Sequence, residues 1–177
     1  MKKLLAFALV IGLFSCNNEI NTNIKQQKVY FEVHHANYAW IVYNNGIMID
    51  SAGNVKSFDL KSANEWEYPD DRGKISAEAM SNNYKHCTSL LTNIEMDSLK
   101  YYVNKISKAA KGTLSKPESI MADAGITEYI AYIFDSKSNM YEKVLLSQWG
   151  DNQITNNSKE ARELYRWLYR ITQDLKQ

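Results

Sequence analysis

Residues 126–135 have the sequence ITEYIAYIFD, residues 136–139 are SKSN, and residues 140–148 are MYEKVLLSQ. The two outer segments are rich in Tyr, Ile, Val and Leu, which favour pleated, half-buried strands. The four residues between them are small or polar and suit a turn. The pattern predicts two antiparallel strands joined as a hairpin, to which further strands can be added.

A second hairpin is expected upstream. Residues 47–50 and 55–60 favour strands, and the loop between them contains Gly53 and Asn54, which tolerate a positive φ angle. This loop is four residues long, a length common in hairpins, so the two strands are expected to pair with each other.

Residues 28–35 predict an N-terminal strand, because their apolar residues alternate with polar ones. One side of this strand carries Val29, Phe31 and Val33, and the other carries Tyr30, Glu32 and His34. Residues 38–43 also favour a strand. The Asn-Asn-Gly sequence at 44–46 indicates either a tight turn or a bulge that carries one strand through.

Three helices are expected. Ser76 is the candidate N-cap of a short helix over residues 76–84. A helix from Asp97, ended by Gly112, has an apolar stripe of Leu99, Val103, Ile106 and Ala110. The last helix, capped near Asn157, has a stripe of Ala161, Leu164, Leu168, Ile171 and Leu175, with Tyr165 and Trp167 at its edges.

This order of elements indicates an α+β fold. We expect an antiparallel sheet of two hairpins plus an N-terminal strand, packed on one face by two or three helices. Residues 28–177 are expected to form a single domain. The formal charge of the 177-residue chain is only +1, which argues against nucleic acid as a partner, because nucleic-acid binding proteins usually carry a clear basic excess.

The N-terminus has the features of a secretory signal. Lys2 and Lys3 precede eleven apolar residues, 4–14, which are too few to span a bilayer. Cleavage after Ser15 or after Cys16 would not place small residues at the two positions that an ordinary signal peptidase site requires. Leu13-Phe14-Ser15-Cys16 instead resembles the lipobox of bacterial lipoproteins, with Phe14 in place of the small residue usual in that family.

The lipobox resemblance implies that residues 1–15 are a signal peptide and that Cys16 becomes the first residue of the mature chain, carrying lipid that includes palmitate. Two or three acyl chains hold a protein stably on a membrane, whereas one holds it only marginally. Residues 16–27 would form a lipidated N-terminus and flexible tether, whose polar part reaches roughly 18 Å. The implied location is the cell envelope, most often the outer membrane, facing the periplasm or the exterior.

A second resemblance concerns the domain itself. Residues 49–55 read Ile-Asp-Ser-Ala-Gly-Asn-Val, and residues 150–152 read Gly-Asp-Asn before a capped terminal helix. Both segments are similar to small uncharacterised secreted bacterial proteins. The likeness covers residues 28–175 and implies no activity.

Metal and nucleophile chemistry find little support in the sequence. His34 and His35 are neighbours on a strand and therefore point to opposite faces, so they cannot share one ion. His86 and Cys87 are also adjacent, whereas the partners of a catalytic Cys-His pair are brought together by the fold. With Cys16 acylated, Cys87 has no disulfide partner and is expected to be a buried or half-buried free thiol. We therefore expect no metal site, no catalytic cysteine and no cofactor.

Two sets of charged residues allow alternatives. Asp123, Glu128, Glu142 and Asp151 are candidates for an acid/base pair if the fold brings them together. Arg162, Arg166 and Arg170 are spaced four residues apart on the last helix. They indicate a solvated face, with Glu163 partly neutralising Arg166, or a surface for lipid headgroups or an acidic partner.

Aromatic residues give the leading interpretation. Trp40 and Trp149 are expected in the core, whereas Trp66 and Tyr68 lie in a polar loop and are candidates for exposed ligand contact. We therefore expect a membrane-anchored binding or interaction module whose partner is an envelope protein or glycan. The alternatives are an envelope hydrolase that uses Asp and Glu residues and an inhibitor of a secreted enzyme that acts through the loop at 61–75.

Replacing Cys16 tests the anchor. The Cys16→Ala chain should accumulate as an unprocessed precursor and take up no labelled palmitate, because the thioether to diacylglycerol requires the sulfur nucleophile. Metabolic labelling followed by gel analysis measures this directly. Unchanged labelling of the variant would refute lipidation at Cys16.

Overall fold

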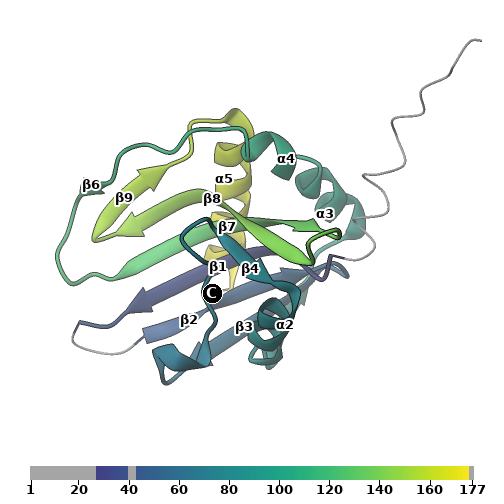
Figure 1. The fold of residues 1–177 in the computed structure, drawn as a ribbon, viewed down its shortest axis with the longest axis horizontal. Coiled ribbons are helices and arrows are strands. Elements are labelled where there is room, and N and C mark those ends of the chain that lie inside the picture. Colours follow the sequence, from purple (N-terminus) through teal and green to yellow (C-terminus); the bar gives the residue numbers. More distant parts are fainter. Residues whose placement is uncertain (1–26, 40–42, 176–177) are drawn as a thin grey trace, which may run out of the picture.

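The structure is a computed structural model and describes residues 27–39 and 43–175. The strands within these residues are β1 (Val29–Asn37), β2 (Tyr43–Asp50), β3 (Asn54–Leu60), β4 (Lys74–Ser76), β5 (Ser89–Asn93), β6 (Glu118–Ser119), β7 (Ile126–Asp135), β8 (Met140–Gly150) and β9 (Asn152–Thr155) (Figure 1). The helices are η1 (Ala63–Glu65), a 3-10 turn, and α2 (Ala77–Lys85), α3 (Met96–Val103), α4 (Ile106–Ala109) and α5 (Lys159–Asp174). Among the described residues, no helix combines the length and apolarity needed to cross a bilayer. The predicted mixture of helices with an antiparallel sheet is confirmed.

The strands form one sheet in the order β5-β3-β2-β1-β7-β8-β9-β6, with β4 beside β8. All of its strand pairs are antiparallel. Both predicted hairpins are present, as β2–β3 and β7–β8, and β1 lies between them. The sheet is larger than predicted, because β4, β5, β6 and β9 extend it. These strands have only two to five residues, too few for an alternating pattern to reveal them.

Side-chain oxygens hold the two hairpin turns. Asp50 Oδ1 accepts hydrogen bonds from the backbone N–H groups of Ala52 and Asn54, both at 2.9 Å. Gly53 lies between them with φ 84°, a value that side chains disfavour. Asp135 plays the same part at the start of the β7–β8 turn. These are the bonds that Asp makes in turns, and they fix the strand register.

The Asn-Asn-Gly segment at 44–46 belongs to β2 and is not a turn. The pairing of β2 with β1 is continuous through it, and Gly46 lies opposite His34 on β1 and Phe58 on β3. A Cβ atom at Gly46 would collide with the carbonyl oxygen of Val33. Glycine therefore allows the backbones to approach closely here. One strand runs through this segment, as the second alternative expected, but its register is regular and the expected bulge is absent from it.

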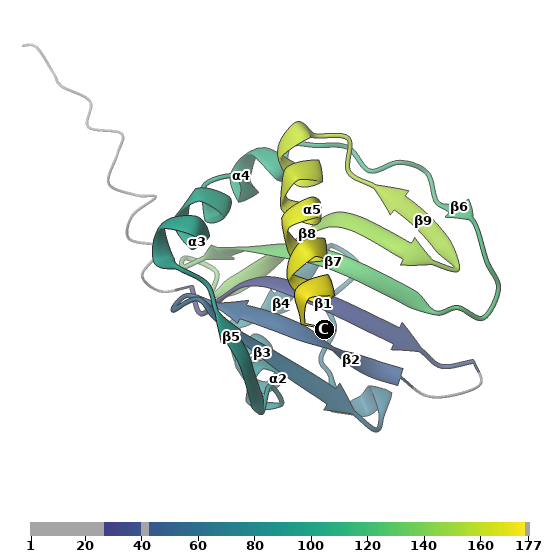
Figure 2. The same ribbon diagram turned by 180° about the vertical axis from the view of Figure 1, so that it is seen from behind.

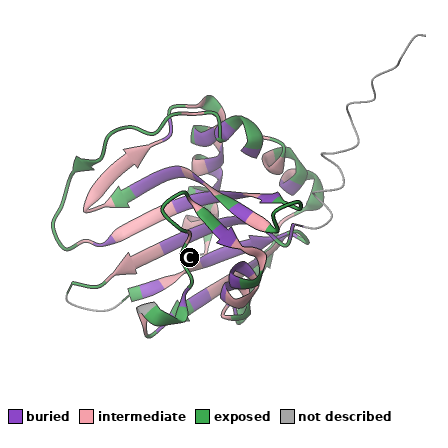
Figure 3. Ribbon diagram, viewed as in Figure 1, coloured by how far each residue is buried: buried purple, intermediate pink, exposed green. Residues whose placement is uncertain are grey.

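Helices cover both faces of the sheet. Figure 2 shows α5 crossing the strands on one face with α3 and α4 to its side, whereas α2 lies on the opposite face (Figure 1). The prediction that the helices share one face is wrong. The central strands are buried over several consecutive residues, because both faces of the sheet are covered (Figure 3). Their side chains contribute to two apolar cores. The core under α5 includes Phe31, Val33, Ile47, Tyr129, Leu164, Trp167 and Leu168. The core under α2 includes Met48, Phe58, Trp66, Ile130 and Tyr132.

The start of α5 differs from the prediction by one residue. Ser158 is the N-cap, and its hydroxyl accepts the N–H of Ala161 at 2.9 Å. The side-chain amide of Asn157 instead bonds to Thr113: its oxygen accepts the Thr113 N–H, and its nitrogen donates to the Thr113 hydroxyl. Trp167, expected at the edge of the stripe, is buried and meets Phe31 edge-to-face at 5.0 Å. This helix therefore buries a wider face than its aliphatic stripe indicates.

The helix predicted from Asp97 is divided into α3 and α4. The N–H of Lys105 bonds to the carbonyl of Tyr102 at 3.0 Å, an i→i+3 bond that tightens the chain at the break. Ala110, which the stripe placed in the core, is exposed, and Ala109 is fully buried instead. The short helix α2 agrees with the prediction, since Ser76 caps it by accepting the N–H of Ala79 at 3.0 Å.

Truncation of Leu168 tests the packing of α5. This side chain is fully buried, and Leu168→Ala should lower the free energy of unfolding by about 2–5 kcal/mol because it leaves a cavity. Leu90→Ala is the control, because Leu90 is 61% exposed on β5 and little contact is lost. Urea unfolding measures both. Equal losses in the two variants would contradict the packing described here.

Candidate functional site

A charged pair is buried on the central strand β1. Glu32 and His34 point to the same face of the sheet and are only 1% and 4% exposed. Glu32 Oε1 lies 2.8 Å from His34 Nδ1. Charged groups are seldom buried unless they are paired, because removing them from water is costly. Their presence in the middle of a sheet therefore marks this position as unusual.

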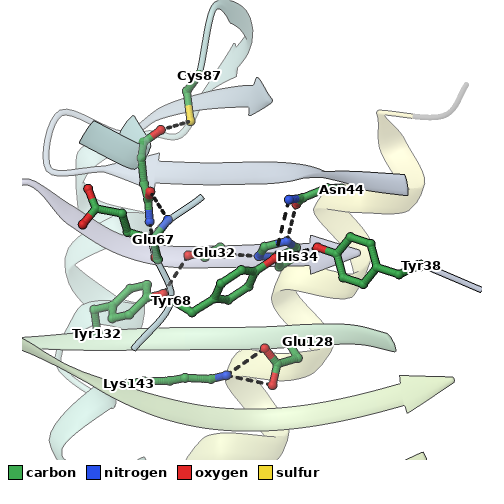
Figure 4. A network of polar contacts seen from close by, with 11 residues as sticks. Glu32, His34, Tyr38, Asn44, Glu67, Tyr68, Cys87, Glu128, Tyr132 and Lys143 are labelled. Atoms are coloured by element: carbon green, nitrogen blue, oxygen red, sulfur yellow. Dashed lines mark hydrogen bonds and ion pairs between the residues drawn. The ribbon is translucent and has the colours of Figure 1, made fainter. Parts of the chain in front are cut away.

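The pair belongs to a chain of hydrogen bonds that extends from the core to the surface. Tyr132 donates its hydroxyl to Glu32 Oε2 at 2.7 Å. On the other side, His34 Nε2 lies 2.6 Å from Asn44 Oδ1. The Asn44 amide nitrogen is 3.5 Å from the hydroxyl of Tyr68, a long contact. The hydroxyls of Tyr68 and Tyr38 are 2.7 Å apart, and their ends turn toward each other near the His34 ring (Figure 4). We call this chain of hydrogen bonds the Glu32–Tyr38 network.

The geometry favours a protonated His34. One ring nitrogen faces a carboxylate oxygen and the other faces an amide oxygen, so both donate when the ring is an imidazolium. Burial lowers the pKa of His34, but the hydrogen bond and charge of Glu32 outweigh it, so the pKa lies above its usual value. Burial and the charge of Glu32 also raise the pKa of Tyr132 well above its usual value, so its hydroxyl stays a donor.

Aromatic rings enclose the imidazole. Phe58 and Trp66 each meet it edge-to-face at 5.3 Å, and Tyr68 stacks on it at 5.7 Å with an interplanar angle of 21°. Trp66 is itself stacked on Phe58 at 4.2 Å and is only 5% exposed. The prediction of an exposed Trp66 is therefore wrong, because the loop folds back over the sheet. Tyr68 is 49% exposed, as expected.

Helix α2 holds this loop in place. Asn83, 1% exposed, accepts the backbone N–H of Glu67 at 2.9 Å and donates to the carbonyl of Glu67 at 2.7 Å. One buried side chain thus satisfies both backbone groups of the residue next to Tyr68. These two hydrogen bonds with the Asn83 side chain fix the backbone at Glu67, so the neighbouring Tyr68 ring is held in a rigid position.

A hollow of about 220 Å³ opens where the network reaches the surface. Its wall includes His34, Tyr38, Tyr68 and Glu128. Lys143 Nζ contacts both carboxylate oxygens of Glu128 at 2.7 Å, so the charge of Glu128 is largely balanced. The hydroxyls of Tyr38 and Tyr68 remain as the accessible polar groups, and burial together with its bond to Tyr38 raises the pKa of Tyr68 above its usual value. The hollow therefore presents two phenol hydroxyls to a ligand.

The four predicted carboxylates do not converge. Glu142 pairs with Ile133, whereas Gly150, next to Asp151, pairs with Ile126 at the other end of β7. At about 3.3 Å per residue these positions are roughly 23 Å apart. Asp151 accepts the N–H of Ala124 at 2.7 Å in a turn. Asp123 is in the same turn with φ 60°, and of the four only Glu128 lies at the hollow.

The remaining candidate residues take structural positions. His35 faces away from His34 and bonds to Thr127 Oγ1 at 2.8 Å, in agreement with the predicted opposite faces. His86 is the C-cap of α2. Cys87 is a buried free thiol, as predicted, and burial raises its pKa to about 12. Across the described ranges, no three His, Cys, Asp or Glu side chains form a group that could hold a metal ion.

Trp149 departs from its predicted place, and two other residues lie outside the described ranges. Trp149 was expected in the core and is 40% exposed, because it lines a surface hollow beside Tyr165 of α5. The structure does not describe Trp40 or Cys16, so the core position of Trp40 and the lipidation of Cys16 stay predictions.

Most of the network was not singled out from the sequence. The signal available was the Glu-x-His spacing on one strand, which places both side chains on one face. Comparison with protein-family models, with curated proteins and with solved structures finds no match for this chain. What the site can do therefore follows from its own geometry.

The variant Glu32→Gln tests the buried pair. It should lower the free energy of unfolding by about 3–5 kcal/mol at neutral pH, because the remaining partner loses its compensating charge. Asp97→Asn is the control, since it breaks the exposed Lys100–Asp97 pair and should change little. Urea unfolding measures both.

The same variant should change the pH dependence. The pKa of His34 is higher in the folded state than in the unfolded state. The pairing therefore contributes fully to the free energy of unfolding when the pH is below the unfolded-state pKa of about 6.5. This contribution is lost as the pH rises through the folded-state pKa. Glu32→Gln should no longer show this decrease. Unfolding curves that have the same pH dependence with and without Glu32 would contradict the pairing.

Proposed function

We propose that this chain is a membrane-anchored bacterial lipoprotein that acts as a binding module of the cell envelope. The anchor part of the proposal is supported by the sequence alone: the cationic start, the apolar segment at 4–14 and the lipobox-like Leu13-Phe14-Ser15-Cys16. On this proposal residues 1–15 are removed, Cys16 carries acyl chains, and the domain faces the periplasm or the exterior. The anchor provides location, and the folded domain provides recognition.

One observation carries the binding part: two half-exposed tyrosines are held by a buried ion pair. Tyr38 and Tyr68 are 48% and 49% exposed and bond to each other. Beneath them, Glu32 and His34 anchor the network in the central strand. Exposed aromatic rings with polar ends are common at binding surfaces. A pair fixed before the ligand arrives loses little conformational entropy on binding.

The size of the hollow limits the ligand. About 220 Å³ is less than the 300–1,000 Å³ typical of pockets that enclose a small molecule. The hollow can therefore take one ring or one side chain of a larger partner. Phenol rings can stack against a sugar ring, and their hydroxyls can exchange hydrogen bonds with it. An envelope glycan, or a protein that inserts one side chain, fits this description.

The inhibitor alternative keeps one supporting observation. The segment that carries Tyr68 is rigidly tied to α2 through Asn83, and residues 70–72 beside it are exposed. A fixed, exposed segment is what an inhibitor presents to its target. The hydrolase alternative has no comparable support. Glu142 lies at the far end of β7 and β8 from Asp151, Glu128 is paired with Lys143, and His34 is engaged at both nitrogens.

Substitution of Tyr68 tests the binding site. The full-length protein in mild detergent is titrated with soluble peptidoglycan fragments and with polysaccharide purified from the envelope. Tyr68→Ala should weaken binding about tenfold or more, the loss expected of an aromatic at the centre of an interface.

Tyr101→Ala is the matched control. Tyr101 is 54% exposed, and its hydroxyl also donates to a neighbour, Glu163, but it lies outside the hollow. Its substitution should leave binding unchanged. If the two variants bind equally well, or if neither probe binds the native protein, the tyrosine pair is not a glycan site. If Tyr68→Ala, but not Tyr101→Ala, then loses binding to a secreted enzyme, the inhibitor alternative is favoured.

A further inference from the structure

The outer face of α5 carries a row of arginines. Arg162, Arg166 and Arg170 are exposed and follow one another at intervals of about 6 Å along the helix axis. Lys159 begins the same face one turn earlier. Among the described residues, none of the three guanidinium groups takes part in an ion pair. This row is called the arginine ridge below.

Among the described residues, Glu163 forms its ion pair with Lys105 and not with the arginines of the ridge. Its carboxylate accepts the hydroxyl of Tyr101 at 2.8 Å and pairs with Lys105 at 3.1 Å, on the side of α3 and α4. These contacts lower its pKa. Glu163 therefore forms no ion pair with Arg166 in the described residues, although both line a hollow of about 710 Å³ on this face. Asp174, one turn beyond Arg170, forms no ion pair with it within the described part of the chain.

A hollow of about 380 Å³ lies along one flank of the ridge. Its lining includes Arg162, Tyr165 and Arg166 from α5 and Trp149 from β8. Trp149 is 40% exposed, so its ring is available to a ligand. The hollow thus combines two unpaired guanidinium groups with an aromatic surface.

The other amides of the hollow are already engaged. The Asn156 amide nitrogen donates to the carbonyls of Ala109 and Leu145, both at 3.1 Å. The Asn157 amide is bonded to Thr113. The charged donors of the hollow are the guanidinium groups, which bind carboxylate, sulfate and phosphate through paired hydrogen bonds.

We propose that the arginine ridge and its flanking hollow bind an anionic polysaccharide. Charged groups along such a chain would pair with successive arginines, while a sugar ring lies against Trp149. A linear polyanion matches guanidinium groups spaced along one line. The recessed flank favours a narrow chain over the flat surface of a membrane. This site is independent of the tyrosine pair, because α5 and α2 cover opposite faces of the sheet.

The test uses the full-length protein in mild detergent. Polygalacturonate is the anionic probe, and neutral dextran is the uncharged one. The double variant Arg162→Gln/Arg166→Gln should weaken binding of polygalacturonate about tenfold or more, since two charge-assisted contacts are lost. Trp149→Ala should weaken it less. Dextran should not bind.

Two comparisons distinguish a specific glycan site from a general effect of positive charge and from binding to a lipid surface. Lys108→Gln/Lys111→Gln removes the same charge from exposed positions elsewhere and should leave binding unchanged. Equal loss in this control pair, or no binding of polygalacturonate by the native protein, would overturn the proposal. Vesicles with anionic and with neutral phospholipid form the last comparison. A ridge-dependent preference for anionic vesicles without glycan binding would assign the surface to membrane contact instead.

Discussion

The ion pair between Glu32 and His34 is the constraint on which the rest of the arrangement depends. It lies on β1, the strand between the two hairpins, where β2 and β7 flank it on either side. A buried charge pair contributes little net stability but is costly to break. Its neighbours must therefore satisfy every remaining polar atom, and no buried side-chain polar atom in the described residues lacks a partner. The positions of Tyr132 and Asn44 follow from that requirement.

The face of the sheet under α2 encloses the Glu32–His34 pair. Covering a charged pair requires a layer that is apolar around it and polar at its edge, and the segment before α2 supplies both. Trp66 and Phe58 close over the imidazole, while Tyr68 carries the hydrogen-bond chain to the surface. The face under α5 has another character. In the described residues it buries no ion pair like that of Glu32 and His34, and its arginines lie on the exposed side of the helix. The molecule thus has one face built around a polar network and one face that displays positive charge.

The parts of the fold that are strongly periodic could be predicted from the sequence. The two hairpins and α5 are long enough for periods of 2 and 3.6 to emerge, and their turn and cap residues make local bonds. The site depends on contacts between residues far apart in the chain, which local patterns do not report. Glu32 and His34 alternate with valine and phenylalanine, so they have the pattern of a solvated face. Trp66 has polar neighbours in the sequence, yet it folds onto Phe58. Asn44 has the local signature of a turn, although it is fully buried in a strand.

The functional account rests on His34 being an imidazolium that is fixed between a carboxylate and an amide oxygen, because only then is the network continuous from the core to the tyrosines. Nitrogen-15 NMR of the imidazole ring at neutral pH tests this most directly. The account predicts that both ring nitrogens of His34 carry a proton, each slow to exchange with water. A ring with a single protonated nitrogen at that pH would contradict it.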